Sequence, residues 1–272
     1  MIKFGIQRME MVIIVIIYFL IGFISSLVGA MAGLGGGVII KPVLDFAGHY
    51  DLATIGVLSA ATVFAMSSVS LIKSGNLEVS VNVKVSSLIA IGSIVGGLIG
   101  KWVFNYFVVS LDLDNIIGVV QSILLALILM LILIYFRWSH FFKSYVLKNS
   151  LAILLAGLGL GFLSAFLGIG GGPLNVAVLA LLFSMNGKEA VINSTFIIFF
   201  SQLSALFLVA FTSGYTDLDL SMLGYMIAGG VIGGFIGSSL LYRISEKVVS
   251  IVFTVTVFIV MVINIYNVFQ YL

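Results

Sequence analysis

The chain has no cysteine, only two prolines and very few charged residues. The absence of cysteine excludes disulfides, thiolate metal sites, iron–sulfur clusters and cysteine nucleophiles. Charged residues form 8% of the 272 positions, whereas a soluble domain carries about 25%. So few charges cannot cover a surface that faces water, and 62% of the residues are hydrophobic. The sequence therefore predicts an all-α polytopic membrane protein whose surroundings are a lipid bilayer.

The charges that are present are almost balanced, with a formal net charge of +2. No basic stripe follows the chain, so nucleic acid is excluded as a partner. The 30 glycines and two prolines favour long helices that approach each other closely through small residues.

Apolar segments of about 20 residues are long enough to cross a bilayer as helices. We expect such helices at 11–31, 54–73, 85–107, 115–136, 150–167, 190–212, 221–242 and 248–271. Two shorter apolar pieces, at 38–47 and 173–184, follow glycine runs and cannot span as helices. Each is either a buried half-helix that turns back or a continuation beyond the membrane surface. The first 32 residues also resemble a signal peptide, but their recurrence mid-chain favours a retained helix.

The chain repeats itself. The run Gly33–Gly37 recurs 135 positions later as Gly168–Gly172, and the segment 95–100 recurs 137 positions later as 232–237. Conserved order and spacing predict a tandem duplication, with a first membrane repeat at 1–136 and a second at 150–272. Residues 137–149 form a basic linker between them.

The distribution of lysine and arginine predicts an orientation. If each glycine run is the tip of a re-entrant hairpin, eight positive residues lie on the side of the linker and four on the other. A simple eight-span path gives seven against five, which indicates nothing. We therefore expect inverted repeats in the cytoplasmic membrane, with the linker in the cytoplasm and both termini outside it. Inverted repeats with interrupted helices are typical of transporters.

Two glycine-tipped helix breaks at equivalent places suggest an anion site. Glycines let the chain turn sharply with no side chain covering the N–H groups. The half-helix that follows presents its unpaired donors and positive dipole end at the break. We expect a small anion to be held by backbone amides of two sets of glycines, namely Gly35, Gly36 and Gly37 and then Gly170, Gly171 and Gly172. The alternative is that these glycines only allow close packing.

The glycine motifs also resemble a known family. The stretch from Gly29 to Gly37, followed by Lys41-Pro42-Val43-Leu44, is similar to the TauE/SafE family of membrane permeases, and so is its second copy from Ser164 to Pro173. The resemblance covers essentially the whole chain and implies transport of small sulfur-containing anions, such as sulfite or sulfoacetate. The family's hydroxyl cluster is present in the second half as Asn193-Ser194-Thr195, whereas the first half has Gly56-Val57-Leu58.

Polar side chains inside the expected spans are further candidates for the substrate site, because a buried polar group in lipid needs a partner. These candidates are Lys41, Ser67, Asn175, Asn193, Ser194, Thr195, Gln202 and Ser204. Lys101 lies near the end of its helix, and we expect its side chain to reach the membrane interface. Aspartates near helix ends, such as Asp51, are expected to cap helices.

These features together predict a secondary transporter for a small anion, a sulfur oxyanion or organosulfonate, that works by alternating access. A passive anion channel or a structural membrane component is the alternative. We expect no enzymatic activity, no metal and no cofactor, since no nucleophile–base pair or metal cluster is visible. The exact anion, the direction of transport, the coupling ion (H⁺ or Na⁺) and the oligomeric state are left open.

Overall fold

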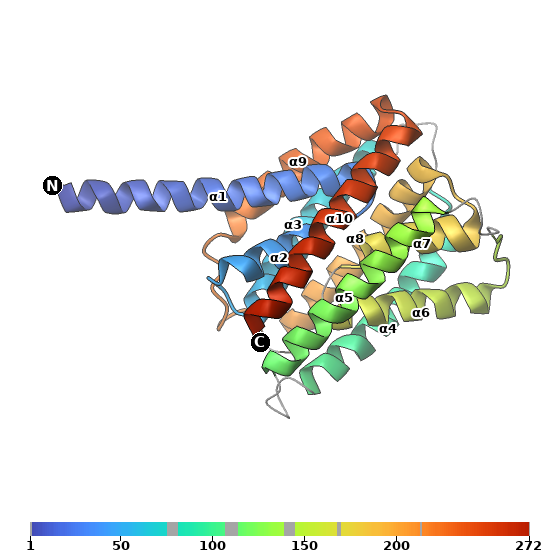
Figure 1. Cartoon of the computed structure of the whole chain (residues 1–272), viewed down its shortest axis with the longest axis horizontal. Helices are drawn as coiled ribbons and strands as arrows, with labels where there is room; N and C mark the ends of the chain where they lie inside the picture. Colours follow the sequence, from blue (N-terminus) through green and yellow to red (C-terminus); the bar gives the residue numbers. More distant parts are fainter. Residues whose placement is uncertain are drawn as a thin grey trace.

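A computed structural model describes residues 2–74, 81–106, 114–138, 145–167, 170–212 and 214–271. These residues form ten α-helices (Figure 1). The helices are α1 (Ile2–Ala32), α2 (Gly37–Ala47), α3 (Leu52–Ser74), α4 (Val83–Asn105), α5 (Asp114–Arg137), α6 (Ser150–Leu167), α7 (Gly172–Phe183), α8 (Gly187–Phe211), α9 (Leu223–Arg243) and α10 (Glu246–Tyr271). The all-helical fold expected from composition is confirmed.

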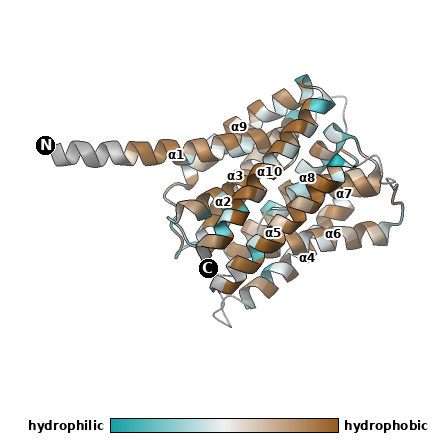
Figure 2. Ribbon diagram, in the orientation of Figure 1, coloured by the Kyte–Doolittle hydropathy of each residue, from teal (hydrophilic) through white to brown (hydrophobic). Residues whose placement is uncertain are grey.

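Eight of these helices are long and apolar enough to cross a membrane. They match the eight expected segments to within a few residues, except that α1 begins at Ile2 and extends away from the other helices (Figure 1). The helices are hydrophobic along most of their length (Figure 2). Large apolar side chains such as Phe211 and Trp102 are exposed on the outside, as expected where lipid is the solvent. The protein is therefore a multi-pass membrane protein.

The two short helices, α2 and α7, follow the two glycine breaks, and at 11 and 12 residues neither spans a bilayer. Gly168 and Ile169 of the second glycine run, and positions 139–144 of the expected linker, lie outside the described residues. Each short helix ends at a residue with a left-handed backbone, Gly48 after α2 and Ser184 after α7.

Helices α4 and α9 pack across the molecule, each against the first helix of the other half. A Cβ on the glycines of one face would overlap a backbone carbonyl of the neighbouring helix. In α4 these contacts are Gly92 with Leu154, Gly96 with Leu158 and Gly100 with Phe162. In α9 they are Gly229 with Phe19, Gly233 with Phe23 and Gly237 with Leu27. These two helix pairs, α4 with α6 and α1 with α9, make the most extensive contacts in the described structure, through the small-residue packing typical of membrane helices.

The contact pairs in the two halves are equivalent. Each glycine of α9 lies 137 positions after its counterpart in α4, and each carbonyl partner in α6 lies 135 positions after its counterpart in α1. The offsets found in the sequence thus recur as contacts between helices.

Candidate functional site

The first helix break joins α1 to α2 through a turn of glycines. Gly33, Gly35 and Gly36 have φ values of +68°, +77° and +66°, a region that other L residues rarely adopt. The N–H of Leu34 donates to the carbonyl of Gly29 at 3.1 Å, and the N–H of Ile40 donates to the carbonyl of Gly36 at 2.9 Å, which starts the new helix. Gly37 is the first residue of α2.

The second break is built in the same way and has polar side chains around it. Gly170 and Gly171 have φ values of +70° and +81°, and α7 begins at Gly172 with Pro173 in its first turn, where proline fits because no N–H partner is needed. A Cβ on Gly170 would lie 3.1 Å from Nε2 of Gln202, and one on Gly171 would lie 3.3 Å from Nδ2 of Asn175. Two amide side chains therefore lie against this break.

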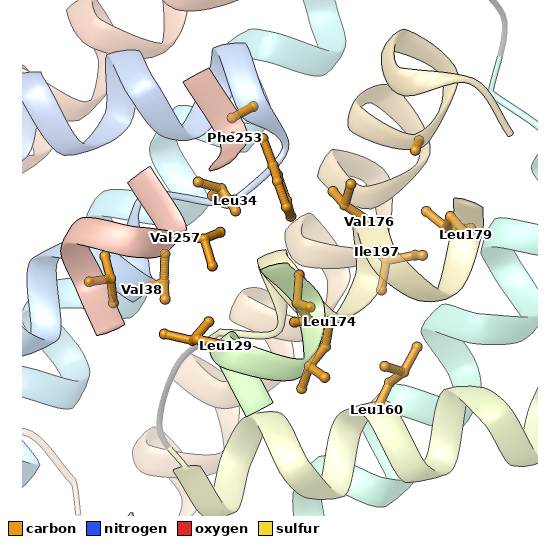
Figure 3. Packing of buried hydrophobic residues seen from close by; sticks show 14 of the residues in the cluster. Leu34, Val38, Leu129, Leu160, Leu174, Val176, Leu179, Ile197, Phe253 and Val257 are labelled. Carbon is orange, nitrogen blue, oxygen red and sulfur yellow. The ribbon is translucent and has the colours of Figure 1, made fainter. Parts of the chain in front are cut away.

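The two breaks touch each other at the centre of the protein. A Cβ on Gly172 would overlap the carbonyl of Leu34, so the backbones are in direct contact. Leu34 and Val38 from the first break, and Leu174 and Val176 from the second, belong to one buried hydrophobic cluster (Figure 3). The helix N-termini of α2 and α7 are therefore brought together, with apolar packing around them.

One face of α8 runs past both breaks. Val191 and Ile198 pack against Gly33 and Gly35 of the first break, and Gln202 reaches Gly170 of the second. Ser194, on the same face, donates from its hydroxyl to the carbonyl of Gly33 at 2.7 Å. These positions follow a spacing of three or four residues, which is the repeat of one helix face.

Several of the expected ligands have hydrogen bonds within the protein. Oδ1 of Asn193 accepts from the N–H of Asn82 at 2.8 Å and from the hydroxyl of Ser86 at 2.6 Å, while its Nδ2 donates to the carbonyl of Glu189. The hydroxyls of Thr195 and Ser67 donate to carbonyls of their own helices, as hydroxyl side chains in membrane helices often do. The bonds of Asn193 join α8 to α4, whereas those of Thr195 and Ser67 lie within α8 and α3.

Other expected ligands have no such partner. Asn175 is 3% exposed and Gln202 is 8% exposed, and neither amide is hydrogen-bonded to a residue that the structure describes. Ser204, two residues after Gln202 on α8, is only partly buried. Neither amide is among the fully buried polar atoms that lack a partner in the described structure, so Asn175 and Gln202 offer accessible polar groups at the second break.

Lys41 lies one helical turn beyond Gly37 and lines a cavity. The other polar groups of this cavity were not expected from the sequence as site residues; they are Asp45, Lys101, Gln121, Ser122, Asn264 and Asn267. Lys101, expected at the membrane interface, lines this cavity with its ammonium 4.8 Å from the ring centre of Phe104. The sequence did contain a sign of this cavity, because two asparagines three positions apart in the apolar helix α10 indicate a polar site inside the protein.

The fold indicates the class of this protein, and a comparison with known proteins gives its family. The eight spans and two broken helices define a multi-pass membrane protein with the architecture of a transporter. A family model described as sulfite exporter TauE/SafE matches residues 18–264, and the chain belongs to this family of membrane transporters. The resemblance inferred from the glycine runs is thereby confirmed.

Two curated relatives are also described as transporters. A probable membrane transporter protein of Methanocaldococcus jannaschii is 29% identical over 215 residues, covering 76% of this chain and 77% of the relative. The probable membrane transporter protein YunE of Bacillus subtilis is 26% identical over 272 residues, covering 90% of this chain and 95% of the relative. No solved structure matches the chain significantly.

Proposed function

We propose that this transporter moves a small anion, a sulfur oxyanion or organosulfonate, across the cytoplasmic membrane by alternating access. The observation that supports this most directly is the meeting of two helix N-termini beside two amide side chains that have no hydrogen bond to the described residues. The starts of α2 and α7 bring positive dipole ends and glycine N–H groups together, and the amides of Asn175 and Gln202 add donors. Such a set favours a negatively charged ligand.

The residues divide into two roles under this proposal. The amides of Asn175 and Gln202, with backbone N–H groups at Gly170 and Gly171 and at Gly35 and Gly36, would contact the anion. Asn193 would hold α8 against the start of α4, and Ser194 would hold it against the first break. The hydroxyls of Thr195 and Ser67 would stay bonded within their own helices.

Alternating access would act on the contact between the breaks. Because the carbonyl of Leu34 is packed against Gly172, an anion can lie between the two breaks only after they separate. We infer that rocking of one half against the other opens this contact, with both termini outside the cytoplasm as the positive charges suggest. The coupling ion, H⁺ or Na⁺, is identified in the experiment below by varying the Na⁺ and pH gradients.

The test is counterflow and current measurement in liposomes that contain the purified protein. Sulfite, thiosulfate, sulfoacetate, taurine, acetate and chloride are compared, each with and without Na⁺ and pH gradients. A secondary transporter gives saturable counterflow for its substrate and a dependence on one gradient. A passive anion channel gives conductance without counterflow. Absence of both flux and counterflow for every anion contradicts the proposal and favours a structural membrane component.

Substitutions then test the site. Gln202→Leu removes the amide at nearly constant volume, and we expect the KM for the transported anion to rise roughly 10- to 100-fold, since a hydrogen bond to a charged group contributes about 1.5–3 kcal/mol. Thr254→Val is the control, because Thr254 is exposed on α10 and bonds only its own helix. An unchanged KM in Gln202→Leu would remove Gln202 from the site.

A further inference from the structure

A polar cavity lies among α2, α3, α4, α5, α6 and α10, and Lys41 is part of its lining. Its volume is about 90 Å³, which is room for a ligand of roughly six non-hydrogen atoms. Leu167, the last residue before the second break, is also in its wall. The cavity therefore adjoins both breaks.

The cavity has an excess of positive charge. Lys41 and Lys101 both line it, and neither ammonium is hydrogen-bonded to a residue that the structure describes. Asp45 supplies one carboxylate, which accepts a hydrogen bond from Nδ2 of Asn267 at 3.3 Å. Among the described lining residues, two lysines therefore stand against one aspartate. A monoanion would balance this excess of positive charge.

The cavity also has an acceptor in need of a donor. Asn267 is 1% exposed, and its Oδ1 has no hydrogen-bond partner among the described residues. Turning the amide over would place its oxygen against the carboxylate of Asp45, where Nδ2 now donates. Asn264, one turn earlier, is bonded through Nδ2 to the carbonyl of Val260. A ligand that satisfies Asn267 must bring an O–H or N–H group of its own.

We propose that this cavity binds a small monoanion that carries a hydrogen-bond donor next to its charged group, as in a hydroxylated carboxylate or sulfonate. Lys41 and Lys101 contact the anionic group, and Oδ1 of Asn267 accepts from the donor. The assignment deepens the transport function proposed above and rests on it for the path by which the ligand arrives. Binding itself is measured without transport.

The first test uses the full chain in detergent and two matched pairs of probes. Glycolate is compared with acetate, and 2-hydroxyethanesulfonate with ethanesulfonate, by titrated shifts of the thermal unfolding midpoint. Within each pair the charge is the same and the hydroxyl differs. We expect the hydroxylated member of at least one pair to bind about tenfold more tightly, and the pair that shows this identifies the anionic group. Equal affinity within both pairs, or no saturable binding, overturns the proposal.

The second test separates the two parts of the site. Lys41→Gln and Lys101→Gln are expected to weaken binding of both members of the pair by about tenfold or more. Asn267→Leu is expected to abolish the preference for the hydroxylated member and to leave binding of the other member in place. Lys84→Gln is the matched control, since Lys84 is exposed at the opposite end of α4. An effect of Lys84→Gln equal to that of Lys101→Gln shows general attraction by charge and overturns the site.

The outcomes also separate this inference from transport. Preferential binding that depends on Lys101 and Asn267, without counterflow in liposomes, supports the cavity and contradicts the transport proposal. Counterflow that is unaffected by Lys41→Gln and Lys101→Gln, with no preference within the pairs, contradicts the cavity alone. If a variant does not fold, the comparison of the paired probes on the unaltered protein still decides.

Discussion

The carbonyl of Leu34 lies directly against the Cα of Gly172, so the backbones of the two helix breaks are in contact. Leu34 is fully buried, and Gly172 begins α7. No side chain fits between them, and α2 and α7 are positioned by this contact.

Gly172→Ala should therefore destabilise the protein and impair transport. Its methyl group would overlap the carbonyl of Leu34, and forced overpacking costs about 1–3 kcal/mol. Gly159→Ala is the control, because a Cβ there meets nothing within 4 Å and alanine favours a helix. The unfolding midpoint in detergent and the counterflow rate are measured for both. A Gly172→Ala protein as stable and active as the control would refute the contact.

The helix pair α4–α6 gives a second prediction, with its control one residue away. A Cβ on Gly96 would overlap the carbonyl of Leu158, whereas a Cβ on Gly97 has its closest neighbour at 3.9 Å. Gly96→Ala should lower the free energy of unfolding by about 1–3 kcal/mol, and Gly97→Ala should leave it unchanged or raise it. Similar losses in both variants would show that the glycine face is not a packing surface.

Asn193 gives a third prediction, which distinguishes a role in holding α8 against α4 from a role in binding the substrate. Its amide joins α8 to the start of α4 through Asn82 and Ser86. Asn193→Leu leaves those donors without an acceptor, so we expect a loss of stability of about 1–3 kcal/mol. The folded fraction of the Asn193→Leu protein should have an unchanged KM for the transported anion. A raised KM with unchanged unfolding would instead place Asn193 at the substrate.

The start of α3 gives a pH-dependent prediction. Asp51 caps this helix, accepting from the N–H and the hydroxyl of Thr54 at 2.8 Å each. Partial burial acts to raise the pKa of Asp51, but the hydrogen bonds from Thr54 outweigh it and the pKa lies below its usual value. A depressed pKa contributes stability that is present above the unfolded pKa, about 3.9, and is lost as the pH falls through the folded pKa.

Asp51→Ala should therefore destabilise the protein by about 1 kcal/mol at pH 7, and the difference from the unaltered protein should shrink as the pH falls from about 5 to 3. Asp51→Asn keeps an uncharged acceptor at the cap, and its stability should depend less on pH over this range. Unfolding midpoints at several pH values provide the measurement. A difference for Asp51→Ala that is constant with pH would mean that the carboxylate charge is not involved.

The helices were predictable because membrane spans are long, apolar and interrupted by glycine. The short helices after Gly37 and Gly172 were also expected, since 10–12 apolar residues cannot cross a bilayer. Asp51 was expected to cap a helix, and its hydrogen bonds from Thr54 at the start of α3 confirm this role. These features depend on local sequence and on the thickness of the membrane.

The partners of the polar side chains could not be predicted in the same way. Asn193 and Gln202 lie on one helix, yet Asn193 bonds to α4 and Gln202 reaches the second break. Lys41 and Lys101 line one cavity although they are 60 positions apart in the chain. Which group meets which is decided by packing between helices distant in sequence, and no local pattern records it.

The crossed packing of α4 and α9 has a consequence for synthesis of the chain. Helix α4 meets its glycine-packing partner α6 soon after it is made, but α1 contacts α9, which is about 200 residues further on. At ~5–20 residues per second, α1 remains in the bilayer without that partner for roughly 10–40 s. The first helix to be inserted is thus among the last to be locked in place, and a chain that stops before α9 leaves the face of α1 around Phe19, Phe23 and Leu27 open to lipid or to another newly made helix.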